Sequence, residues 1–410
     1  MFRIQNIRFF LLVVLLVLTA FTYLPVFSNV VTTGEGSNPL NRYVVLVAVL
    51  SFLLYFDYRS WLKNRFIVTF VICLFLTGII GVMLAQADVT KRYQTAANEL
   101  LIAFLGLAIG YSSQLSKKQL LSLVIIYSSS VAIVTYQQLM QHAGGFIIMD
   151  LYFSYGKNTM GVMCAVSCVS LIISSLYVDN KYMRLFMRAL YLFILLLCIS
   201  IRARASFLVI FLLTIFCIYK QMKHRRITME SVSWVVFGGL FIMGLLFVFP
   251  QIFNSIIDYV ADSFTRNHEG SVTAGREDGW RIGVSVISNN PLFGNMVVKK
   301  QYDFASIHNY FLRILSEFGI IGSLPFMILY FRLMFLTIRK SIKLPINIEN
   351  VGLFTTIVLL IISLEEPTFP YSPGTGVIMS FILLGNTLRI NQRCSHVRFY
   401  QPQYSKNVII

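Results

Sequence analysis

A histidine beside a hydrophobic segment is the feature of this sequence best suited to chemistry. His308 and Asn309 follow a long hydrophilic loop, and nine residues later come Gly319 and Gly322. A neutral imidazole at the outer end of a membrane helix can take a proton from a hydroxyl group. The alternative interpretation is a helix-end histidine whose ring is satisfied by backbone groups.

Two arginines occupy a tight turn between apolar runs. Arg202 and Arg204 lie in the stretch 200–206, which has hydrophobic sequence on both sides. Guanidinium groups in such a place are costly unless they meet an anion or lie at the level of the lipid headgroups. Because guanidinium binds phosphate oxygens bidentately, this turn is a candidate diphosphate clamp. An interfacial arginine that contacts lipid phosphate is the competing interpretation.

A second pair of arginines lies on the hydrophilic loop. Arg276 and Arg281 flank Trp280 at the start of an expected helix. Arg276 near a helix N-terminus would add to the positive end of the helix dipole and favour an anion. The alternative is a solvated cluster in which Arg276 or Arg281 pairs with Glu277 or Asp278.

Metal ligands do not form a recognisable pattern. The sequence has no HExxH motif, no phosphate-binding P-loop and no external Asp-x-Asp pair, so neither a metal nor a cofactor is predicted. Glu365 and Glu366 are the acidic pair of the last external loop, where they either orient an acceptor or form a solvated turn. Five of the six cysteines fall in apolar runs and are expected to be small buried side chains; Cys394 lies in the tail.

These residues must be positioned by membrane helices. Of 410 residues, 57% are hydrophobic and 12% are charged, and the apolar residues come in long runs. A soluble domain has no use for so much apolar surface. The fold class predicted is therefore an all-α polytopic membrane protein.

Twelve membrane spans are expected, the first retained and not cleaved as a signal peptide. Basic residues are more numerous on the side that holds both termini, so both ends are predicted to be cytoplasmic. The net charge of +17 then reflects topology and anionic lipid, not nucleic acid. Residues 1–388 form the transmembrane domain and 389–410 a polar, poorly ordered cytoplasmic tail. The spans are 9–27, 40–56, 66–86, 98–111, 120–140, 158–177, 187–201, 204–219, 233–250, 315–337, 351–363 and 375–388.

The largest loop, 251–307, is predicted to be external and to carry two amphipathic helices. Apolar residues from Phe253 to Phe264 repeat with helical spacing, which is typical of a helix lying on a membrane surface. Trp280, Val284 and Ile287 repeat the spacing in a second helix, which the sequence 289–291 should end.

This ordered set of motifs resembles the O-antigen ligase and polymerase family of membrane glycosyltransferases. His308-Asn309, nine residues and Gly319-x-x-Gly322 match the ligase signature at every fixed position. The stretch 275–294, with Arg276, Trp280 and Pro291-Leu292-Phe293-Gly294, is similar to the loop of that family, although a glycine here directly precedes the arginine. Further similar elements are Arg204-Ala205-Ser206 and Tyr155-Gly156-Lys157-Asn158.

The resemblance implies a metal-independent, GT-C type glycosyltransferase in the bacterial inner membrane, with its active face in the periplasm. The donor would be a glycan on undecaprenyl diphosphate and the acceptor a saccharide. His308 would be the catalytic base, and Arg204 and Arg276, with Arg202 and Arg281 in reserve, would bind the diphosphate. Asn309, Gly319, Gly322, Lys157 and Trp280 would have supporting roles.

Three activities stay open at this stage. A polymerase passes the glycan to another lipid-linked unit, a ligase passes it to lipid A–core, and a transporter moves it across the membrane. His308 lies only 32 positions after Arg276, and this short insert favours the polymerase. A chain-length regulator is a further partner that the resemblance leaves open. The charged residues gather at one face and not within the spans, which disfavours a lipid-linked glycan flippase or other transporter.

Overall fold

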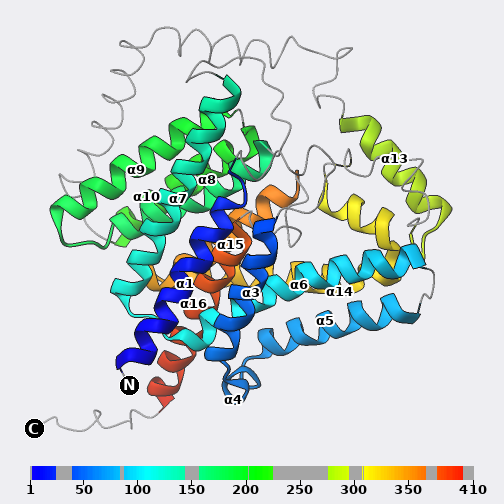
Figure 1. Ribbon diagram of the computed structural model, residues 1–410, viewed down its shortest axis with the longest axis horizontal. Coiled ribbons are helices and arrows are strands. Elements are labelled where there is room, and N and C mark those ends of the chain that lie inside the picture. The colour runs from blue at the N-terminus through cyan, green and yellow to red at the C-terminus, as the bar shows by residue number, and fades with distance from the viewer. Residues whose placement is uncertain are drawn as a thin grey trace, which may run out of the picture.

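The computed structural model describes a helical protein (Figure 1). It covers residues 2–24, 39–83, 87–143, 157–201, 203–224, 276–294, 307, 309–365 and 376–399. Throughout these ranges the regular structure is helical. The helices are α1 (Phe2–Phe21), α3 (Pro39–Leu54), α4 (Tyr58–Trp61), α5 (Arg65–Met83), α6 (Ala87–Ser113), α7 (Lys117–Ala143), α8 (Lys157–Ser175), α9 (Lys181–Ser200), α10 (Arg204–His224), α13 (Arg276–Asn289), α14 (Tyr310–Lys343), the short 3-10 helix η3 (Ile348–Asn350), α15 (Val351–Ser363) and α16 (Ile378–Phe399).

Many of these helices have the length and composition of membrane spans. Within the described ranges, seven are long and apolar enough to cross a membrane, and three shorter apolar helices accompany them. Every predicted span in these ranges coincides with a helix, and 351–363 has the same bounds as α15. The predicted span 233–250 and the predicted helix around Phe253 to Phe264 lie outside the described residues. The protein is thus an all-helical, multi-pass membrane protein.

The core of the bundle is built by close packing of α6, α15 and α16. Gly110 on α6 and Gly385 on α16 lie against the backbone of the opposite helix, so a Cβ at either position would collide with it. Small residues let helix backbones approach in this way, which favours association inside a membrane. The cysteines of this bundle, Cys73, Cys164, Cys168, Cys198 and Cys217, are buried and free, as expected.

Helix α14 reverses direction at Gly319. This residue has φ 65° and ψ −173°, a backbone conformation that glycine adopts readily. The Tyr310 ring stacks on Tyr330 at 5.0 Å and the Phe311 ring stacks on Phe331 at 5.5 Å. In a straight helix, residues this far apart would be separated by about 30 Å. Residues 310–318, here called the arm, therefore fold back along the long part of α14 (Figure 1, yellow against orange).

The arm changes the predicted position of the histidine motif. The sequence predicts a helix that enters the membrane directly after His308. The structure instead places the arm between residue 308 and the long helix, because Gly319 interrupts the apolar run. Asn309 and Gly319 consequently lie at opposite ends of the arm, and Asn309 lies at the level of Tyr330 and not at the tip.

Helix α16 extends through the predicted tail boundary. Arg389 lies 3.9 Å from the Asp57 carboxylate and its guanidinium carbon lies 5.1 Å from the centre of the Tyr111 ring. Asn391 donates to the side-chain oxygen of Asn350 at 3.3 Å. The helix continues to Phe399, since these contacts hold its polar part against α6, α4 and η3. The helix thus extends past the predicted boundary at residue 388.

Candidate functional site

Asn309 fixes the chain next to the predicted base. Its side-chain oxygen accepts a hydrogen bond from the Leu312 amide at 3.1 Å, which caps the arm. Its side-chain nitrogen donates to the carbonyl oxygen of Leu364 at 3.1 Å, which ties the arm to the end of α15. His308 itself lies outside the described residues. The Asn309 side chain therefore sets the position of the backbone that carries the histidine.

The residue on the other side of the histidine is also anchored. Ile307 is fully buried and packs against Val286 of α13, with Ile282 and Leu312 beside it. A Cβ on Gly283 would lie 3.4 Å from the Cδ1 atom of Ile307. Helix α13 thus packs on the arm and on the segment that leads into it.

A glycine-containing face of α13 makes this contact. Val284, which belongs to the predicted apolar stripe, is 57% exposed. The contact is made by Gly283 and Val286, with Gly279 buried on the same face. Glycines permit the close approach of α13 to the arm, which a helix carrying Val284 inward would prevent.

Two predicted motifs meet at the tip of the arm, in a contact here called the clasp. The Ile320 amide donates to the Pro291 carbonyl at 2.8 Å, and the Ile321 amide donates to the Leu292 carbonyl at 3.0 Å. The reversal at Gly319 leaves the first amides of the long helix without partners in their own helix. Carbonyl groups of the Pro-Leu-Phe-Gly turn satisfy them, and so the clasp joins the loop of α13 to the membrane helix.

Glycines make the clasp possible. A Cβ on Gly294 would lie 2.6 Å from the Gly319 amide nitrogen and 2.7 Å from the Glu317 carbonyl carbon. A Cβ on Gly319 would collide with the backbone of Leu292 and Gly294. Both residues also have positive φ, 71° and 65°. Each of these glycines is thus required twice, for its backbone conformation and for the space beside it.

Gly322 makes room for a tyrosine from α6. A side chain at this position would collide with the hydroxyl oxygen of Tyr93. The Tyr93 ring packs edge-on against Phe318 at 5.0 Å, and its Cβ abuts Gly81 of α5. This tyrosine therefore fastens the tip of the arm to α5 and α6, a contact that no sequence motif signals.

Glu317 and Arg313 form an ion pair along the arm. The Arg313 Nε atom lies 3.1 Å from a carboxylate oxygen of Glu317, whose side chain is only 3% exposed. A buried carboxylate requires such a partner, because losing it would leave an uncompensated charge. The ion pair therefore belongs to the support of the arm.

Two further predicted cations, Lys157 and Arg204, are the first residues of α8 and α10. A Cβ on Gly161 would lie 2.7 Å from the hydroxyl oxygen of Ser206, and it would collide with Ala203. Since Gly161 is one turn into α8 and Ser206 is in the first turn of α10, Lys157 and Arg204 begin adjacent helices. The positive ends of two helix dipoles therefore meet here.

Helix α15 connects these helix starts to Asn309. Lys220, near the end of α10, donates to the carbonyl groups of Ser341 and Leu344, just before α15 begins, so α10 and α15 run antiparallel. The Phe216 ring of α10 lies 6.3 Å from the Phe354 ring of α15. At a rise of 1.5 Å per residue, Arg204 lies about 18 Å from Phe216 towards the start of α10. Leu364 lies about 15 Å from Phe354 towards the end of α15, which is the same direction because the helices are antiparallel. Arg204 and the Asn309–Leu364 contact are thus at the same end of the bundle.

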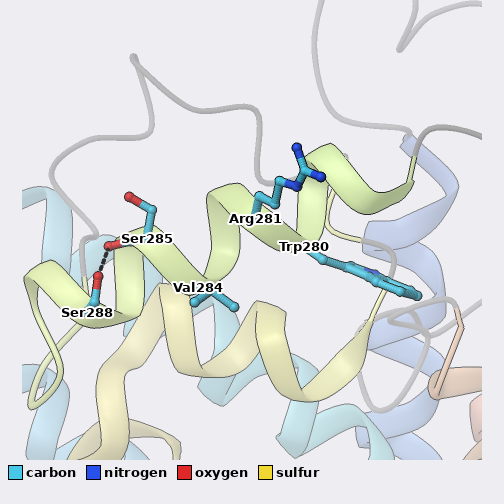
Figure 2. A pocket seen from close by; sticks show the side chains of 5 residues that line it. All are labelled: Trp280, Arg281, Val284, Ser285 and Ser288. Carbon is cyan, nitrogen blue, oxygen red and sulfur yellow. Dashed lines mark hydrogen bonds between the residues drawn. The ribbon is translucent and has the colours of Figure 1, made fainter. Parts of the chain in front are cut away.

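The outward face of α13 carries Trp280 and Arg281 (Figure 2). They line a hollow of about 550 Å³ together with Val284, Ser285 and Ser288. The Trp280 indole nitrogen is buried and has no hydrogen-bond partner among the described residues. For Arg202 there is no described structure, and for Arg204, Arg276 and Lys157 the structure describes the backbone alone.

Arg204 and the Asn309–Leu364 contact thus lie at one end of the bundle, and the clasp joins the turn after α13 to the tip of the arm. Residues 189–327 match the O-antigen ligase family. This stretch includes Arg204, α13, the arm and both glycines of the motif that follows the histidine. The match supports the resemblance to the O-antigen ligase and polymerase family, and with it a glycosyltransferase-type enzyme of O-antigen synthesis. No curated protein matches the chain.

Sequence reasoning missed several residues that support this region. Leu364 and the carbonyl groups of Pro291 and Leu292 act through their backbone, which leaves no side-chain pattern to find. Tyr93 looks like one of the many interfacial aromatics of a membrane protein. The available signal was the pair of glycine-containing motifs that hold Gly294 and Gly319, since glycine permits close contact between backbones.

Proposed function

We propose that this protein is a membrane glycosyltransferase that moves a glycan from undecaprenyl diphosphate to a saccharide acceptor, acting as a surface polysaccharide polymerase. The observation that carries the proposal is the clasp, which links the Arg276 helix to the His308 arm. Support also comes from the family match over residues 189–327, which spans both parts.

The proposed reaction is one in-line displacement at the anomeric carbon of the donor sugar. His308 takes the proton of the acceptor hydroxyl, whose oxygen forms the new glycosidic bond. The bond from the anomeric carbon to the diphosphate oxygen breaks, and undecaprenyl diphosphate leaves with the electron pair. A single displacement inverts the configuration at that carbon.

Arginines stabilise the leaving group in this proposal. Arg204 and Arg276, with Arg202 as a further candidate, neutralise the charge that grows on the diphosphate. Guanidinium groups supply there the positive charge that a metal ion supplies in other transferases, so the reaction is proposed to be independent of metal. The active end would face the periplasm from the inner membrane, as the distribution of basic residues predicts.

A ligase is the second candidate, and the description of the matching family favours it. The two activities share the donor and the site and differ in the acceptor, which is another lipid-linked unit for a polymerase and lipid A–core for a ligase. The short stretch between Arg276 and His308 favours the polymerase.

The test uses bacteria deleted for the gene and complemented with the wild-type or the His308→Ala chain. Surface glycan is separated on a gel. A polymerase predicts that the deleted cells, and those with His308→Ala, carry lipid A–core capped by a single repeat unit without a ladder. A ligase predicts loss of all glycan from lipid A–core while lipid-linked polymer accumulates. Normal ladders in the deleted cells would refute both.

A further inference from the structure

The hollow on the outward face of α13 has no part in the proposed chemistry. Helix α13 packs on the arm through Gly283 and Val286, while Arg281 and Ser285 are exposed. Figure 2 shows the Arg281 and Ser285 side chains projecting from α13 on the side away from the arm. At about 550 Å³, the hollow lies in the size range of small-ligand sites.

The groups that line the hollow are those that bind sugars. The Trp280 ring offers an apolar face, and its buried indole nitrogen has no hydrogen-bond partner in the described part of the chain. Arg281 is exposed and makes no ion pair with a described residue. The Ser288 hydroxyl donates to the Ser285 carbonyl at 2.8 Å, and both serines are exposed. The exposed Arg281 guanidinium and Ser285 hydroxyl, beside an aromatic ring, suit a pyranose with its apolar face and its many hydroxyls.

Arg281 is poorly placed to share a diphosphate with Arg276. The two residues are five positions apart on α13, which turns them about 140° from each other around the helix. Arg281 also has an indole, a valine and two serines around it, and no described cation in the hollow. A bidentate guanidinium in these surroundings fits a sugar carboxylate or a pair of neighbouring hydroxyls.

We propose that Trp280, Arg281, Ser285 and Ser288 form a saccharide subsite that holds a sugar unit of the glycan next to the reacting end. The inference rests on the proposed function, because it needs a glycan at this end of the bundle. The sugar can come from the donor or from the acceptor, and the shared chemistry is that of a pyranose with polar substituents.

The first test measures binding without turnover. The full-length protein in nanodiscs is titrated with the oligosaccharide of repeat units released by mild acid from the lipid-linked glycan of the cells that make it. Arg281→Ala and Trp280→Phe are expected to weaken binding about tenfold, the effect of losing one charged or buried hydrogen bond. Arg339→Ala, an exposed arginine at the other end of α14, is the matched control and should bind like wild type.

The second test assigns the sugar to a substrate. Initial transfer rates are measured against donor and against acceptor concentration. A rise of about tenfold in one KM, with kcat nearly unchanged, identifies the substrate that uses the subsite. Equal binding by wild type and both variants, absence of binding to wild type, or a fall in kcat alone would overturn the subsite. Failure of the proposed function would look different, since oligosaccharide binding would depend on Arg281 while the wild-type chain transferred no glycan.

Discussion

At the scale of residues, the chain on both sides of His308 is fixed by neighbours that need not react. Ile307 is buried against α13, and Asn309 is hydrogen-bonded to the arm and to α15. A general base must be held within hydrogen-bond reach of the proton that it takes, so small shifts of its backbone cost rate. Asn309 is therefore a positioning residue in this account.

Substitutions of Asn309 should separate the effects of its two side-chain hydrogen bonds, one to Leu312 and one to Leu364. Asn309→Ala loses the cap and the bond to Leu364, and it should lower the free energy of unfolding by about 1–2 kcal/mol. Asn309→Ser can still cap the arm but cannot reach Leu364. Thermal unfolding in detergent should place the serine variant between wild type and alanine, while both variants lose turnover. Equal turnover of Asn309→Ser and wild type would show that the Leu364 bond has no role in positioning the base.

At the scale of elements, the clasp is what joins the loop to the membrane helix. Its hydrogen bonds run from amides at the start of the long part of α14 to carbonyl groups of Pro291 and Leu292. The glycines at 294 and 319 let the two backbones touch. The orientation of α13 relative to the arm thus depends on two positions where any side chain is excluded.

Gly319→Ala should be among the most damaging single substitutions. It introduces strain at φ 65° and a collision with the backbone of Leu292. We expect a loss of about 3 kcal/mol or more of stability, or opening of the clasp, with transfer reduced at least tenfold. Folding is followed by size-exclusion chromatography and thermal unfolding, and transfer by gel.

Gly78→Ala on α5 is the matched control. This glycine lies in a regular part of its helix, and a Cβ there has nothing within 4 Å. Alanine should be neutral or stabilise the helix by about 0.5–1 kcal/mol. If Gly319→Ala behaved like Gly78→Ala in stability and in transfer, the clasp would have no structural role.

The sequence predicts the helices of this fold far better than their bends and contacts. Long apolar runs locate α5, α8 and α15 within a few residues, because length and hydropathy decide a membrane span. The reversal at Gly319 escapes such reasoning, since a glycine in an apolar run is also tolerated within a straight helix. The face of α13 that packs on the arm escapes it too, because Gly283 and Val286 form this contact and the predicted stripe of Trp280, Val284 and Ile287 includes neither of them.

The motifs of the candidate site are easier to find than their arrangement. The spacing from His308 to Gly322 and the Pro291–Gly294 turn are visible in the sequence, but their direct contact depends on the reversal of the chain. Arg204 and Asn309 come to the same end of the bundle through α15, a connection that needs the packing of three helices.

At the scale of the whole molecule, the proposed site gathers at one end of a bundle whose spans hold few charges. That arrangement suits an enzyme that works at the membrane surface on a substrate anchored in the lipid. It also requires that end to face outward, while the far ends of α14 and α10, which meet through Lys220, face the cytoplasm.

Labelling of single cysteines tests this orientation. Asn289→Cys lies on α13 and Arg339→Cys lies near the far end of α14, and both positions are exposed. A membrane-impermeant thiol reagent added to intact spheroplasts should label the first and not the second. Labelling of the native cysteines should be low, because the five described ones are buried. Cys394 is replaced by serine in both variants. Labelling of Arg339→Cys alone would reverse the proposed topology.

The central claim is that His308 is the base of a glycosyl transfer held in place by the arm and the clasp. Its most direct test is the rate of glycan transfer by purified, reconstituted protein supplied with undecaprenyl-diphosphate-linked repeat units. His308→Ala should fold like wild type, keep its KM for the donor and lose kcat by about 100-fold or more. An active wild type accompanied by a His308→Ala variant of equal kcat would contradict the account.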